Sequence, residues 1–182
     1  MAKLRKMLGA ADSPYILSLM SLIETQSKTT IGDWCVDYAE KCILNIYEKA
    51  FPEDDRLRLA VEAYRSYRKG ELKLPELKKA AALTVQAAKE AEKNPAAQAA
   101  ARTIGQAIGA VYTPTHSLGL AFYGAAAIAY DVGLRSLFEL LHSSFSFSFL
   151  LSVRISGSIC RVPRLGSSIV TSGIRISCSS LA

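Results

Sequence analysis

Three prolines, each preceded by a side chain that can cap a helix, divide this chain into helical segments. The pairs are Ser13 with Pro14, Asn94 with Pro95, and Thr113 with Pro114. The first side chain of each pair can accept a backbone N–H group at a helix start, and proline is tolerated at the first helical position. The three pairs therefore predict helices that begin at residues 14, 95 and 114.

Apolar residues recur at helical spacing after residue 33. Because they advance by three or four positions, they draw one stripe that faces a core. We expect Ser27–Gly32 to be a loop and Asp33 to cap this helix. The residues of the stripe are Cys35, Ala39, Cys42, Ile43, Ile46 and Ala50.

A third helix is predicted between Pro52 and Gly70. Glu53, Asp54 and Asp55 lie at its start, where carboxylates accept free backbone N–H groups and complement the helix dipole. Glycine is a common helix end, because it readily adopts a left-handed conformation. We expect five residues of these two helices to be buried together, namely Cys35, Cys42, Ile46, Val61 and Tyr64.

Three further helices are predicted over residues 75–93, 95–112 and 114–134. They are rich in alanine and glycine, so their backbones can approach closely. The predicted fold is all-α, a compact bundle of about six helices formed by residues 1–142. Residues 33–134 are expected to form its core.

Residues 143–182 differ sharply from this pattern. They contain no Asp, Glu, Lys, Asn, Gln or Tyr, and their four charges are all arginines. Alternating segments such as Phe145–Phe149 are compatible with an appended hairpin. We favour the interpretation that out-of-frame or otherwise unselected sequence has replaced the native C-terminus, so that this Ser/Phe/Ile-rich tail is not part of the core.

Charge and cysteine usage narrow the functional classes. The net charge is +6, but residues 1–142 hold 18 basic and 16 acidic residues, a net +2. The two signs are interleaved, as on a solvated helix face, so we expect no nucleic-acid partner. The longest apolar segment is too short to span a membrane. Cys35 and Cys42 lie about 10 Å apart along one helix, too far to bridge, which favours the cytoplasm.

No catalytic motif is present. His116 and His142 each lack a cluster of nearby ligands or nucleophiles, and the acidic triplet at residues 53–55 lacks the spacing of a calcium loop. We predict no catalytic, cofactor-binding or metal-binding residues, no cofactor, and no enzyme activity.

Several segments resemble the Imm-5-like immunity proteins of bacteria. The resemblance is carried by Trp34, Pro52–Arg56, Lys69–Glu71 and the alanine-rich residues Ala99–Gly119, and it covers about residues 33–134. It implies a protein that binds and neutralises a cognate protein toxin. The candidate partner-binding residues are Asp54, Asp55, Arg56 and His116.

A second interpretation remains open. The chain is alternatively a helical enzyme or small-ligand-binding protein that uses a pocket near His116, with Arg102 and Tyr112. Convergence of these side chains around a cavity would favour that alternative.

Overall fold

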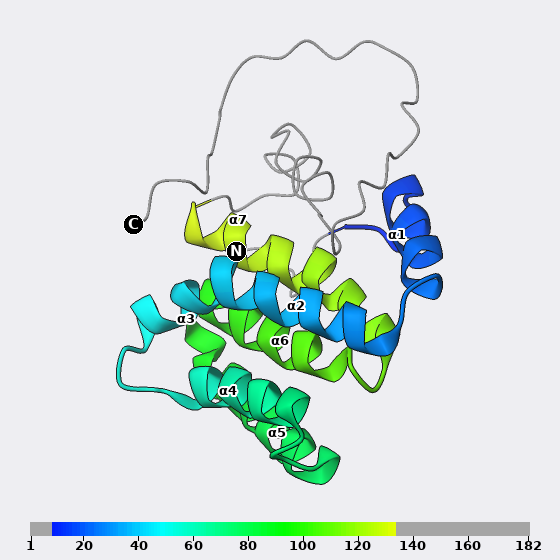
Figure 1. Cartoon of the computed structure of the whole chain (residues 1–182). Helices are drawn as coiled ribbons and strands as arrows, with labels where there is room; N and C mark the ends of the chain where they lie inside the picture. The colour runs from blue at the N-terminus through cyan, green and yellow to red at the C-terminus, as the bar shows by residue number, and fades with distance from the viewer. Residues whose placement is uncertain (1–8, 134–182) are drawn as a thin grey trace.

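The computed structural model describes residues 9–133, and every regular element in that range is helical (Figure 1). This confirms the all-α prediction. The predictions about the tail and His142 lie outside the described residues. The elements are α1 (Pro14–Glu24), α2 (Lys28–Cys42), α3 (Leu44–Ala50), α4 (Arg56–Lys69), α5 (Leu74–Glu90), η1 (Ala91–Lys93), α6 (Pro95–Gly109), η2 (Pro114–Ser117), η3 (Leu120–Gly124) and α7 (Ala125–Asp131).

Helix α6 lies at the centre of the bundle. It packs against α2, α3, α4, α5 and α7, and Figure 1 shows α2 and α7 on one side of it and α4 and α5 on the other. Its small side chains allow this close packing: Ala97, Ala100 and Ala101 are fully buried. The α5 contact is especially close, because a Cβ atom added at Gly105 would overlap the hydroxyl of Thr84.

Most predicted helix boundaries are confirmed. The Ser13 hydroxyl accepts the backbone N–H of Ile16, and the Asn94 side chain accepts that of Ala97 at 3.1 Å. Pro114 begins η2, a 3₁₀ turn that leads into the last long helical segment. Gly70 ends α4 with a left-handed φ of 80°, which is readily accessible to glycine.

The predicted helix over residues 33–50 is wrong in two respects. It begins earlier, because Ser27 rather than Asp33 provides the N-cap, and its hydroxyl accepts the backbone N–H of Thr30 at 3.1 Å. Residues 28–32 are therefore helical and not a loop. The helix also breaks at Ile43, where φ is −118°, and divides into α2 and α3.

The predicted core is largely confirmed. Cys35, Ile46, Val61 and Tyr64 belong to one buried cluster, whereas Cys42 is only partly buried against it. Cys35 and Cys42 are not joined by a disulfide bond, as their helical spacing predicted. Burial raises the pKa of the Cys35 thiol, so this residue behaves as a small apolar side chain.

Helix α1 lies at the edge of the bundle (Figure 1). Its buried residues Ile16, Leu19 and Ile23 occupy one face, while Leu17 and Met20 are exposed. None of the helices within residues 9–133 has the length and apolar character needed to cross a membrane.

Candidate functional site

Asp54 is the centre of a hydrogen-bond cluster at the start of α4. Arg56 binds its carboxylate through two side-chain nitrogens, Nε at 2.8 Å and Nη2 at 2.6 Å, and through its backbone N–H at 3.1 Å. The Tyr47 hydroxyl donates to the same carboxylate, and Arg56 also binds Glu90 at the end of α5. The cluster thus joins α3, α4 and α5.

These contacts set the ionisation of the cluster. The hydrogen bonds from Arg56 lower the pKa of Asp54 to about 2, and the Tyr47 hydroxyl adds to that effect against the opposing influence of burial. Burial, followed by the nearby Asp54 carboxylate, raises the pKa of Tyr47. Asp54 is therefore ionised and fully used within the protein at neutral pH, as a structural group.

Glu53 and Asp55, which flank Asp54 and were also predicted to cap α4, are more exposed than Asp54. Asp55 is the N-cap residue of α4, yet its side chain caps no backbone N–H group. Both Asp55 and Glu53 are exposed and have no side-chain hydrogen bond or ion pair among the described residues. The predicted capping by three carboxylates is thus carried out by Asp54 alone, and the side chains of its two neighbours are exposed.

The other arginines of α4 pair with acidic residues on neighbouring helices. Their partners were not predictable individually, because each lies at least ten residues away in the chain. We call this set, together with the Asp54 cluster, the ionic layer. Its further members are Arg68 with Asp33 and Tyr64, Arg65 with Asp37 and Glu40, and Arg58 with Glu48.

His116 lies elsewhere, in η2 next to the end of α6. Its ring is edge-on to that of Tyr112, with 6.1 Å between centroids, and Lys78 of α5 lies over the Tyr112 ring at 5.2 Å. A Cβ atom at Gly109 would overlap the His116 ring, so glycine is required there for this close approach. The Nδ1 atom of His116 is buried and has no hydrogen-bond partner among the described residues.

His116 begins a line of contacts between α6 and the segment that follows it. Gly109 faces His116, Gln106 faces Gly119, and Arg102 faces Tyr123. We call this line the α6 seam. Tyr123 lies in η3, where the backbone forms a π-helix, a distortion that is frequent at functional sites.

The alternative interpretation required His116 and Arg102 to converge around one cavity. Gly109, which His116 touches, is seven residues from Arg102 on α6, which is about 10 Å along the helix axis. The two side chains therefore share a seam but occupy different turns of it. Within residues 9–133 there is also no group of three or more histidine, cysteine or acidic side chains that could hold a metal ion.

The four predicted partner-binding residues do not form one cluster. Asp54, Asp55 and Arg56 lie near Glu90, whereas His116 lies near the Tyr112 and Lys78 pair. Lys78 and Glu90 are twelve residues apart on α5, about 18 Å along its axis. Two separate surfaces result.

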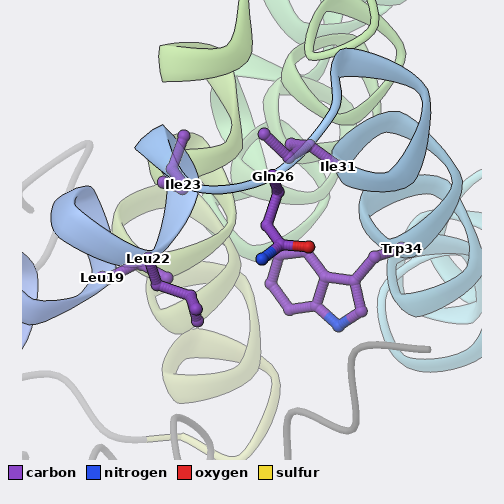
Figure 2. Close-up of a pocket in the computed structure, with 6 residues that line it drawn as sticks. All are labelled: Leu19, Leu22, Ile23, Gln26, Ile31 and Trp34. Atoms are coloured by element: carbon purple, nitrogen blue, oxygen red, sulfur yellow. The ribbon is translucent and has the colours of Figure 1, made fainter. Parts of the chain in front are cut away.

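A small pocket lies between α1 and α2 (Figure 2). Its volume is about 10 Å³, close to the room that one water molecule needs, and its lining is apolar. An organic ligand does not fit such a space. The lining residues are Leu19, Leu22, Ile23, Gln26, Ile31 and Trp34.

Comparison with protein families gives one decisive result. The family model of the Imm-5 like putative immunity protein matches residues 21–140, more than half of the chain. The chain belongs to this family. Comparison with curated proteins and with solved structures finds no match.

The match places both surfaces inside an immunity-protein family domain. Sequence reasoning identified Asp54, Arg56 and Arg102, but it missed their respective partners Tyr47, Glu90 and Tyr123. Tyr47 carried a local signal, since it lies seven residues before Asp54 on the preceding helix. Glu90 and Tyr123 reach their arginines only through helix packing, which the sequence pattern does not specify.

Proposed function

We propose that this protein binds a cognate bacterial toxin in the cytoplasm and neutralises it through a stoichiometric complex, without catalysis. Membership of an immunity-protein family carries this proposal. Such a protein acts through a stable scaffold with a complementary surface. The helical bundle, with its densely packed central helix, supplies a scaffold of this kind.

The surface that we propose for toxin binding is the start of α4. The hydrogen bonds to Asp54 hold the residues around it in one conformation, and the flanking Glu53 and Asp55 are exposed. Leu59, one turn along α4 from Asp55, is 49% exposed and provides an apolar contact beside the two acids. A preorganised acidic surface of this kind fits a basic patch on a partner.

The experiment is co-expression of the neighbouring gene's product with and without this protein. We expect that product to arrest growth when expressed alone and to be tolerated when the immunity protein is present. Purification should then yield a complex of fixed stoichiometry. A toxic product that remains toxic and does not bind would contradict the proposed function for that pair.

The acidic surface is tested separately by charge reversal. The double variant Glu53→Lys, Asp55→Lys should weaken toxin binding about ten- to a hundred-fold, because two attractive contacts become repulsive. Glu71→Lys is the matched control, since this exposed acid follows the opposite end of α4. Equal affinity of the wild type and the double variant would place the toxin on another surface. Catalytic turnover that disappears in His116→Ala would support the enzyme alternative instead.

A further inference from the structure

Arginines within residues 9–133 follow a pattern with one exception. Arg56, Arg58, Arg65 and Arg68 each bind at least one carboxylate oxygen. The fifth, Arg102, binds no carboxylate in this part of the chain. Its Nη1 atom is buried and has no hydrogen-bond partner there.

Within the described residues, the α6 seam around Arg102 contains no acidic side chain. Residues 95–130, which include all of α6, η2 and η3, contain neither aspartate nor glutamate. Asp131 lies beside Lys49 at 3.7 Å. On α5, Glu76 accepts the backbone N–H of Lys73, and Glu90 is bound by Arg56.

The guanidinium of Arg102 is nevertheless held in place. The Tyr123 ring lies 5.8 Å from its central carbon, close enough for a cation–π contact that limits its movement. The residue as a whole is partly exposed, although its Nη1 atom is buried. A buried N–H group of a charged side chain is costly when it has no acceptor, and water or a bound ion is the usual explanation.

We propose that Arg102 in the α6 seam is a binding site for an oxyanion, either a carboxylate or a phosphate group. The planar fork of a guanidinium matches both groups with two parallel hydrogen bonds. Gln106, one turn along α6 from Arg102, is the next polar residue of the seam, and its side chain lies against Gly119. This inference goes beyond the proposed function, because it concerns a small ligand and a surface distinct from the start of α4.

The test is titration of the full-length protein with inorganic phosphate and, separately, with sodium acetate. Ionic strength is matched with sodium chloride, and binding is followed by isothermal calorimetry and by the NMR signal of the Arg102 Nε–H group. We expect saturable binding of at least one of the two anions. The anion that binds identifies the class: phosphate alone, carboxylate alone, or oxyanions in general.

Two variants locate the site. Arg102→Met removes the charge and should weaken binding at least about ten-fold, as expected for loss of a charged hydrogen-bond donor. Arg102→Lys keeps the charge without the fork and should bind with intermediate affinity. Arg58→Met is the matched control and should bind as the wild type does. The proposal is overturned if neither anion binds saturably, or if Arg102→Met and Arg102→Lys both bind as tightly as the wild type.

Discussion

The ionic layer and the α6 seam use the same residue type in opposite ways. In the ionic layer, arginines on α4 are neutralised by carboxylates from α2, α3, α5 or the segment before α4. In the α6 seam, Arg102 faces an aromatic ring and has no acidic partner among the described residues. The first arrangement contributes to the stability of the bundle, whereas the second leaves hydrogen-bonding capacity for something outside it.

The largest effect is expected in the ionic layer. Arg56→Met should lower the free energy of unfolding by about 1.5–3 kcal/mol, because it removes charge-assisted hydrogen bonds to the mostly buried Asp54. Denaturation in urea measures this change. Arg58→Met is the control, since its pair with Glu48 is more exposed and should contribute less than about 1 kcal/mol. Equal losses in the two variants would show that burial of Asp54 does not matter.

The second expected effect is a pH dependence of the stability that the ionic layer provides. The pKa of Asp54 is about 2 in the folded protein, below its ordinary value near 4, so its stabilising contribution is complete above pH 4 and lost as the pH falls towards 2. Without Arg56 the largest cause of this lowering disappears. The difference in unfolding free energy between wild type and Arg56→Met should therefore narrow from pH 5 to pH 2.

Denaturation curves across this pH range provide the measurement. Comparing each variant with the wild type cancels the titration of carboxylates that Arg56 does not contact, including Asp33, where burial opposes but does not outweigh the lowering of the pKa by Arg68 and Tyr64. Glu90 does not cancel, because Arg56 also lowers its pKa, and its titration adds to the narrowing. The free energy of unfolding of Arg58→Met should change with pH in parallel with that of the wild type. A constant gap between wild type and Arg56→Met would mean that Arg56 does not control the ionisation of Asp54.

The smallest effect is expected in the α6 seam. Arg102→Met should change the free energy of unfolding by less than about 1 kcal/mol in either direction. The variant loses the contact with Tyr123 but also removes a buried N–H group that has no acceptor. Thermal denaturation without added oxyanions measures this change in the free energy of unfolding. A loss as large as that of Arg56→Met would mean that Arg102 is a structural residue like those of the ionic layer.

Local signals in the sequence were sufficient where a helix boundary depends on a few adjacent residues. Ser13, Asn94 and Gly70 act as predicted, because capping and left-handed termination are decided within one turn. The start of α2 was missed, since Ser27 is followed by Lys28 and two threonines, which gave no apolar repeat to mark a helix. The break at Ile43 was also missed, because no glycine or proline lies near it in the sequence.

The candidate site was less predictable than the fold. Asp54 was identified at the start of α4, but its role depends on Tyr47, Arg56 and Glu90, which come together only after α3, α4 and α5 have packed. The lack of an acid near Arg102 is visible as an acid-free stretch over residues 95–130. The burial of the Arg102 Nη1 atom cannot be predicted from the sequence, because it depends on how neighbouring helices pack.

The central position of α6 also affects the nascent chain on the ribosome. Helices α2, α3, α4 and α5 are all synthesised before α6, the helix against which each of them packs. At elongation rates of about 5–20 residues per second, several seconds pass between the synthesis of α2 and that of α6, and during this time the part of the α2 apolar stripe that packs on α6 is uncovered. The apolar residues of this stripe, Cys35, Val36 and Ala39 among them, are thus candidates for transient chaperone contact during translation.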